Sequence, residues 1–283
     1  MSTDQPFLSV RGLTKAFVAR RSLPARLRRE PAHVVRAAQD VSFAIPRGRT
    51  FALVGESGSG KSTIAQMVVG LLAPDAGTIR VDGAPIDGDG PARAALRRRV
   101  QMVFQDPYTS LNPRWRVGAI VAEPFHALGL PVARQDIPER VGELLGKVGL
   151  HLSDAERYPH EFSGGQRQRI AIARTLAARA DLVVCDEPTS ALDVSVQAQI
   201  LNLMRDLQDE FGLTYLFISH NLAVVRFMAD EVGVLKDGVL VEAGAAARVL
   251  DAPRHPYTRA LLAAVLDPAQ AAGPEPHRTA IDA

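Results

Sequence analysis

The chain has 283 residues, of which 47% are hydrophobic and 23% charged, so it can bury the core of one large or two small globular domains. Its net charge of +2 is too small to indicate a nucleic-acid partner. The single cysteine, Cys185, excludes an internal disulfide framework and is typical of a reducing cytoplasm. No secretory signal is visible, and no apolar run approaches the ~20 residues that a membrane span needs.

The N-terminal part of the chain is predicted to form strands. Alternating apolar residues predict an edge strand over 7–17, and short apolar stretches predict strands over 41–45 and 78–81. The segment 20–36 carries six arginines and two prolines and lacks an apolar face. It is interpreted as a solvated surface loop or, alternatively, as a contact for anionic lipid headgroups, in which each nearby basic residue contributes ~1 kcal/mol.

A glycine-rich stretch at 55–62 fits the pattern G-x-x-x-x-G-K-[ST] of a phosphate-binding loop. A buried strand is predicted before it over 51–54, and a helix is predicted after it over 61–72. In such a turn, backbone N–H groups converge on phosphate oxygens beside the positive end of the helix. Lys61 is expected at the β- and γ-phosphates, and the Ser62 hydroxyl on Mg²⁺. The residues expected to bind the nucleotide are Gly55, Glu56, Ser57, Gly58, Ser59, Gly60, Lys61, Ser62 and Thr63.

The rest of the chain alternates strands with helices. A loop-rich stretch from 107 to about 160 contains predicted helices around 117–128 and 139–148. A hairpin turn at 236–238 leads into a strand over 239–241, and the polar end from 273 is predicted to be disordered. Further apolar strands are predicted over 100–104, 182–185, 215–219 and 232–235. This alternation favours a mostly parallel, doubly wound α/β sheet with a helical insertion.

Polar side chains follow three of the predicted strands. Asp186 and Glu187 follow the strand over 182–185, Gln105 follows the strand over 100–104, and His220 follows the strand over 215–219. Ligands of open α/β sheets bind at the carboxyl ends of the strands, so these groups are expected to meet. Because successive residues leaving a strand point to opposite faces, we assign Asp186 to Mg²⁺ and Glu187 to the attacking water as general base. Gln105 can bind Mg²⁺-bound water, and His220 can donate to the γ-phosphate.

A second anion-binding helix start is predicted at 163–166. Ser163 and Gln166 have the spacing of a capping box, and Gly164 with Gly165 leaves the first N–H groups of the helix bare. The alternative is an ordinary helix cap. Two such helix starts in a chain with one nucleotide loop suggest that two copies pack head to tail, each completing the other's site.

These motifs, in this order, resemble those of an ABC transporter ATP-binding subunit. The phosphate loop, Gln105, 163–166, Asp186 with Glu187, 190–193 and His220 are similar to its Walker A, Q-loop, signature, Walker B, D-loop and H-loop. The resemblance implies a P-loop NTPase over 7–251, with a RecA-like α/β core, an antiparallel β subdomain and a helical signature subdomain inserted at about 107–175. It implies a dimer that sandwiches two ATP molecules, with Asp193 among the nucleotide-binding residues. Phe17 is the candidate for stacking on adenine, and the alternative is that its side chain only packs within the fold.

Finer motifs resemble the oligopeptide/dipeptide importer subfamily, and within it the second of two paired ATPases. They lie at 104–113, 158–162 and 254–258, and the last falls in an expected C-terminal extension, 252–283. Some members carry a C-terminal cysteine cluster, which this chain lacks, and some lose the Walker B glutamate, which it keeps as Glu187. The resemblance therefore implies a hydrolytically competent, peripheral subunit on the cytoplasmic face of the inner membrane. Its expected partners are transmembrane permease subunits, a second ATP-binding subunit and, indirectly, a solute-binding protein.

Two other functions have the same catalytic motifs. An ABC ATPase of a soluble complex, such as a carbon–phosphorus lyase accessory subunit, stays open as an alternative. A DNA-repair or chromosome-organising ATPase is set aside, because zinc-binding cysteines and a long coiled coil are both missing. The transported solute, and the choice between a homodimer and a heterodimer, are left open.

Overall fold

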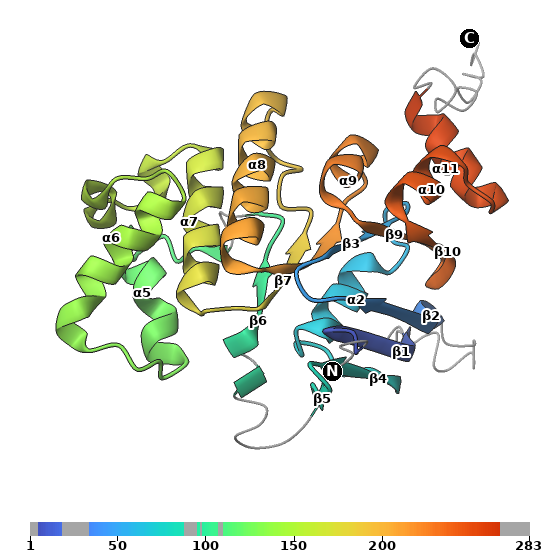
Figure 1. The fold of residues 1–283 in the computed structure, drawn as a ribbon, viewed down its shortest axis with the longest axis horizontal. Helices are drawn as coiled ribbons and strands as arrows, with labels where there is room; N and C mark the ends of the chain where they lie inside the picture. The colour runs from blue at the N-terminus through green and yellow to red at the C-terminus, as the bar shows by residue number, and fades with distance from the viewer. Residues whose placement is uncertain (1–4, 19–33, 88–94, 97, 107–109, 267–283) are drawn as a thin grey trace, which may run out of the picture.

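The computed structural model describes residues 5–18, 34–87, 95–96, 98–106 and 110–266, in which two β-sheets organise the chain (Figure 1). The smaller sheet is antiparallel and has the order β2-β1-β4-β5. Its strands are β1 (Leu8–Val18), β2 (Val34–Ile45), β4 (Ala76–Val81) and β5 (Ala84–Pro85).

The larger sheet has the order β10-β9-β3-β8-β7-β6, and all its pairings are parallel except that of β10 with β9. Its strands are β3 (Thr50–Val54), β6 (Val100–Val103), β7 (Leu182–Asp186), β8 (Thr214–Ile218), β9 (Glu231–Lys236) and β10 (Val239–Ala245). Every residue of β3, β7 and β8 is buried, as expected for parallel strands covered on both faces. The predicted mostly parallel sheet is confirmed.

Helices cover the larger sheet and form a lobe at one side of it, on the left of Figure 1. The lobe holds α5 (Val117–Ala127), α6 (Ile137–Lys147), α7 (Gly164–Ala177) and the short 3₁₀ turns η1 (Arg134–Asp136), η2 (Leu152–Glu156) and η3 (Pro159–Glu161). The remaining helices are α2 (Lys61–Val68), α8 (Val194–Phe211), α9 (Leu222–Met228), α10 (Ala246–Asp251) and α11 (Pro256–Leu266). Within the described part of the chain, no helix combines the length and apolarity that crossing a bilayer requires.

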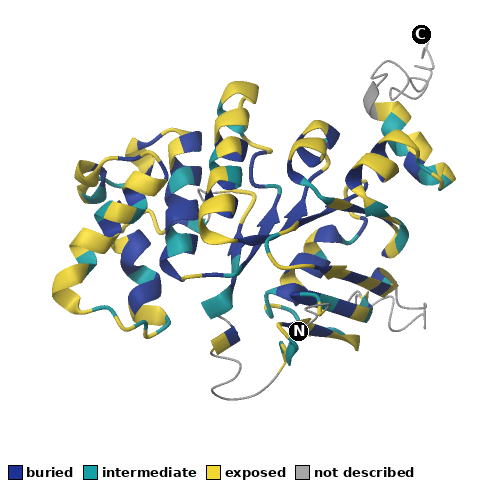
Figure 2. Cartoon of the chain, in the orientation of Figure 1, coloured by how far each residue is buried: buried dark blue, intermediate teal, exposed yellow. Residues whose placement is uncertain are grey.

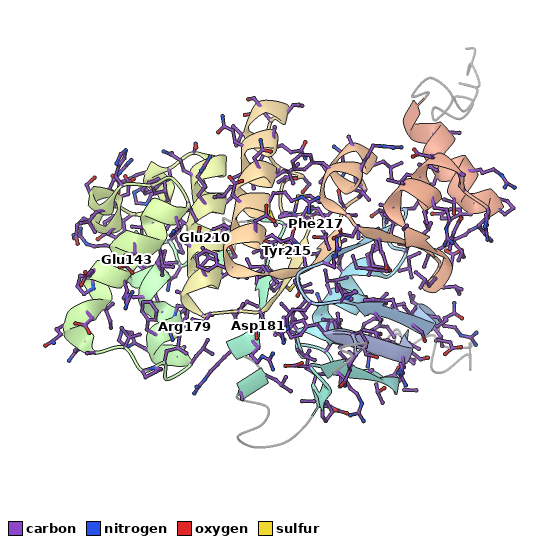
Figure 3. The ribbon with its side chains drawn as sticks, viewed as in Figure 1. Glu143, Arg179, Asp181, Glu210, Tyr215 and Phe217 are labelled. Atoms are coloured by element: carbon purple, nitrogen blue, oxygen red, sulfur yellow. The ribbon has the colours of Figure 1, made fainter. Side chains whose placement is uncertain are left out.

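Two buried clusters hold these layers together, and Figure 2 shows the buried residues concentrated along the central strands. One cluster packs Ile64 and Met67 of α2 between the two sheets. The other joins the opposite face of the larger sheet to the helical lobe and to α8. Tyr215 and Phe217 of β8 lie in this interior (Figure 3), where the buried Tyr215 hydroxyl donates to the Met204 carbonyl oxygen at 3.0 Å.

Three local predictions are wrong in detail. The strand predicted at the sheet edge, β1, pairs with β2 on one side and β4 on the other, so it is interior. The helix predicted over 61–72 ends at Val68, because Gly70 adopts a φ of 72° and turns the chain. Residues 34–36, predicted as loop, already belong to β2.

Other sequence predictions lie outside the described residues. They are the arginine-rich segment over 20–33, positions 107–109 of the segment that follows Gln105, and the polar end from 273.

Candidate functional site

The phosphate loop connects the buried strand β3 to α2, as its pattern predicts. Gly60, the residue before the helix, has a φ of 104°, a conformation that favours glycine. A Cβ atom at Gly60 would lie 1.9 Å from the carbonyl oxygen of Ala37 in β2. Both the backbone conformation and the contact with β2 therefore require glycine here.

A pocket of about 640 Å³ opens over this loop. Gln105, Glu187 and His220, which come from the ends of three different strands, line it together with the loop. Phe17 and Val35 of the smaller sheet form another wall, with 42% and 47% of their surfaces exposed. The other lining residues are Ala37, Ser57, Gly58, Gly60, Lys61, Ser62 and Thr63.

Lys61 is held inside the loop. Its Nζ donates to the carbonyl oxygens of Gly55 at 2.8 Å and Glu56 at 2.7 Å, and to the Ser59 hydroxyl at 3.3 Å. Burial lowers the pKa of Lys61, and the nearby carboxylates of Glu187 and Asp186 oppose that shift. The loop therefore presents a partly desolvated cation at the place where phosphate oxygens are expected.

Asp186 lies at the end of β7 and accepts a hydrogen bond from the Ser62 hydroxyl at 3.1 Å. Burial raises the pKa of Asp186, while the hydrogen bond from Ser62 acts in the opposite direction. Hydroxyl, carboxylate and amide oxygens are hard ligands of the kind Mg²⁺ prefers, so Ser62, Asp186 and Gln105 fit such an ion. The described residues contain no group of three or more His, Cys, Asp or Glu side chains able to hold a metal alone. Mg²⁺ is usually bound through one or two carboxylates, several waters and substrate phosphates, and the single carboxylate of Asp186 beside Ser62 fits that mode.

Glu187, the residue after Asp186, has different hydrogen-bond partners from Asp186. Its Oε1 lies 3.0 Å from Nδ1 of His220, and its Oε2 accepts a hydrogen bond from the Gln105 amide at 3.4 Å. The backbone of Glu187 has a φ of 48°, a left-handed conformation that costs a non-glycine residue of order 1–3 kcal/mol. With this backbone conformation, Glu187 lines the pocket over the phosphate loop.

The predicted signature forms a helix start away from this pocket. Ser163 caps α7, its hydroxyl accepting from the Gln166 N–H at 3.3 Å while the Gln166 side chain accepts from the Ser163 N–H at 3.0 Å. Asp193 caps α8 by accepting from the Val196 N–H at 3.0 Å. Within one chain, none of the signature residues, nor Asp193, lines the pocket over the phosphate loop.

Cys185 and two glycines have packing roles. Cys185 is buried within β7, and burial raises the pKa of its thiol. A Cβ atom at Gly165 would lie 2.3 Å from a methyl carbon of Val196, and one at Gly164 would lie 3.2 Å from Leu192. The two glycines thus let α8 approach the start of α7, a function that the motif alone does not reveal.

Three residues at the site were not predicted from the sequence: Val35 and Ala37, which line the pocket, and Tyr257, which contacts the loop. The Tyr257 hydroxyl lies 3.4 Å from the Glu56 N–H, although 201 positions separate the two residues. The only signal for Tyr257 was its place in the 254–258 motif.

Comparisons with known proteins agree with this arrangement. Two family models match, "ABC transporter" over residues 38–190 and "Oligopeptide/dipeptide transporter, C-terminal region" over 241–281. A putative peptide import ATP-binding protein of Brucella abortus is 55% identical over 234 residues, or 82% of this chain and 70% of that protein. The oligopeptide transport ATP-binding protein AppF of Bacillus subtilis is 47% identical over 266 residues, or 93% of this chain and 79% of that protein.

The fold of a solved structure is also similar to the fold of this chain. It is a dimeric ATP-binding cassette in a post-hydrolysis state bound to ADP and Pi, 27% identical to this chain with a TM-score of 0.71. The match covers 84% of this chain and 98% of that one. It confirms the predicted P-loop NTPase fold.

Proposed function

Since the chain belongs to the ABC transporter family, we propose that it is the ATP-binding and ATP-hydrolysing subunit of an importer for oligopeptides or dipeptides. The observation that carries the proposal is the pocket in which the phosphate loop meets Glu187 and His220. The peptide substrate class is supported by the names of the relatives and by the match of the C-terminal region. That match disfavours the alternative of an ATPase in a soluble complex.

The polar groups of the pocket suggest a division of labour. Lys61 leaves its carbonyl partners to bind the β- and γ-phosphates of ATP. Ser62 and Asp186, with Gln105, would hold a Mg²⁺ ion, which when bound neutralises charge on the phosphate oxygens. Glu187 accepts the proton of the attacking water, and His220 donates to the γ-phosphate.

The pocket of one chain is only half of the proposed catalytic site. Ser163 and Gly165 start α7 outside the pocket, so in a single chain they cannot reach a nucleotide held by the phosphate loop. We infer a head-to-tail dimer in which the helix start of one subunit closes on the ATP of the other. The dimeric state of the similar cassette supports this inference. Phe17 is half-exposed on the facing wall of the pocket, which supports a role for its ring in stacking on adenine.

The proposed membrane partners would bind along α5. Of the hollows along this helix, two, of about 830 and 440 Å³, are both lined by Glu123 and Ala127. Trp115 in one and Phe104 in the other are exposed at 42% and 38%, and Phe104 directly precedes Gln105. A permease segment seated here would sense the nucleotide through Gln105. Docking of a permease in this way would hold the subunit at the cytoplasmic face of the inner membrane, with a solute-binding protein acting indirectly.

The first test is Glu187→Gln in the full chain. We expect hydrolysis to fall by about 10²–10⁴-fold, the usual contribution of a general base, while ATP still supports a dimer in size-exclusion chromatography. Glu210→Gln is a matched control, because Glu210 pairs with Lys147 on the surface and does not line the pocket. Full hydrolysis by the Glu187 variant would refute the base assignment. Uptake of labelled di- and oligopeptides by a deletion strain tests the substrate class.

A further inference from the structure

The phosphate loop is touched from outside the pocket by the C-terminal part of the chain. The Tyr257 hydroxyl on α11 accepts a hydrogen bond from the Glu56 N–H at 3.4 Å. At the other end of the loop, the Gly238 N–H in the β9–β10 turn donates to the Ser59 carbonyl oxygen at 3.0 Å. Two C-terminal elements therefore hold the two ends of one loop.

Tyr257 is fixed in place by neighbours from separate elements. The Glu242 carboxylate on β10 accepts from the N–H groups of Arg254 at 2.8 Å and His255 at 3.0 Å, which fixes the start of α11. His255 Nδ1 then accepts from the Tyr257 N–H at 3.2 Å. The Lys236 ammonium lies 4.9 Å from the centre of the Tyr257 ring, a cation–π contact. The phenol is thus oriented before it meets the loop.

The peptide that Tyr257 contacts is the one that holds the loop lysine. The N–H of Glu56 and the carbonyl group of Gly55 belong to the same peptide unit, and in a trans peptide they point in opposite directions. Tyr257 accepts from this N–H on one side, and the carbonyl oxygen accepts from Lys61 at 2.8 Å on the other. Fixing this peptide plane therefore fixes the group against which Lys61 rests.

We propose that Tyr257 is a positioning residue of the nucleotide site: its hydroxyl anchors the Gly55–Glu56 peptide, so that the C-terminal segment keeps the phosphate loop and Lys61 ordered for ATP. The proposal rests on the proposed function, in which this loop binds ATP. Tyr257 acts through the loop and does not touch the reacting atoms. Without the Tyr257 hydroxyl, the nucleotide-free loop samples more conformations. ATP binding must then supply the free energy of ordering the loop, which lowers the affinity.

The test is Tyr257→Phe in the full chain, which removes only the hydroxyl. One hydrogen bond corresponds to a loss of affinity of about 3- to 10-fold, so we expect the Kd for ATP and the KM of hydrolysis to rise by that factor. The kcat at saturating ATP is expected to stay within about 2-fold, because the groups that perform the chemistry are unchanged. The melting temperature is expected to stay within about 3 °C. Kd is measured by titration with a fluorescent ATP analogue.

Two further variants make the result decisive. Tyr158→Phe removes a phenolic hydroxyl in the helical lobe, where the ring stacks on His160, and is expected to leave all four quantities unchanged. Glu242→Ala releases the start of α11 but keeps the phenol, so it is expected to raise Kd in the same direction as Tyr257→Phe.

Each outcome decides the matter. Failure of the unmodified chain to bind ATP would refute the proposed function itself. If the unmodified chain binds ATP and Tyr257→Phe binds it equally well, the positioning role is refuted. A fall of kcat and melting temperature together with affinity would make Tyr257 a general structural residue and would also overturn the inference.

Discussion

Gly165→Ala separates the packing role of the signature helix start from its proposed role at a partner's nucleotide. The new methyl carbon would lie 2.3 Å from Cγ1 of Val196, in the first turn of α8. Real carbon–carbon contacts optimise near 3.5–4.0 Å, so α8 must move away or Val196 must leave its rotamer. Asp193 caps the same turn through the Val196 N–H, and this bond resists the shift.

The expected loss of stability follows from two opposing effects. Inserting a methyl group into a packed contact costs about 1–3 kcal/mol. Replacing glycine by alanine in a helix returns up to ~1 kcal/mol, and less in a first turn. The net loss of about 1–2 kcal/mol corresponds to a fall of the melting temperature by roughly 2–8 °C for a chain of this size.

The assay is thermal unfolding of Gly165→Ala, Val196→Ala and the double variant. Since Val196→Ala removes the methyl carbon that clashes, the double variant should recover about 1 kcal/mol relative to the sum of the single effects. Additivity within about 0.5 kcal/mol would refute the packing argument. ATP hydrolysis by the double variant then tests the proposed role of Gly165 at a partner's nucleotide. A double variant that is stably folded but inactive would support a close approach of the partner's phosphate to Gly165. Recovered hydrolysis would limit the role of Gly165 to packing.

Ser62 and Asp186 form the proposed metal-binding side of the pocket. Ser62→Ala is expected to weaken ATP binding by about 10-fold or more in the presence of Mg²⁺, and much less in its absence, because the Ser62 hydroxyl beside Asp186 is the proposed metal ligand. Titration with ATP in the presence and absence of Mg²⁺ measures this difference. Equal losses of affinity under the two conditions would contradict the assignment of Ser62. Burial raises the pKa of Asp186, so the folded chain holds its ionised form at a cost that is present above the raised pKa and absent below the unfolded value near ~4. Asp186→Asn is therefore expected to raise the melting temperature of the nucleotide-free protein at neutral pH and to lose this advantage toward about pH 4, and a gain independent of pH would contradict the electrostatic cause.

Local patterns predicted most of the candidate site, because strand–loop–helix units fix their own geometry. At the end of β7, Asp186 pairs with Ser62 and Glu187 with His220, so the two successive residues have separate partners. His220 joins them because parallel strands align their carboxyl ends at one edge of the sheet. The positions of these side chains could therefore be predicted from the strands that precede them.

The errors and omissions concern contacts between distant parts of the chain. Nothing within β1 indicates that both of its sides are paired, since its partners begin 26 and 68 residues after Leu8. The extent of β2 was missed because its first three residues continue an arginine-rich stretch. The contact of Tyr257 with the loop joins residues 201 positions apart, and a tyrosine on an amphipathic C-terminal helix carries no mark of such a partner.

The hydrogen bonds among the site residues bear on why the proposed site would need a second copy. Lys61 is held by two carbonyl oxygens, Asp186 by the Ser62 hydroxyl, and Glu187 by His220. Each of these partners must be exchanged for a phosphate, a metal ion or a water before hydrolysis, and each exchange has a cost in a partly buried site. The N–H groups of Gly164 and Gly165 at the start of α7 in a second copy would supply compensating contacts to the γ-phosphate only when ATP is present. On this argument the internal pairs suppress hydrolysis by a lone chain, and the rate of ATP hydrolysis per chain is expected to fall steeply on dilution.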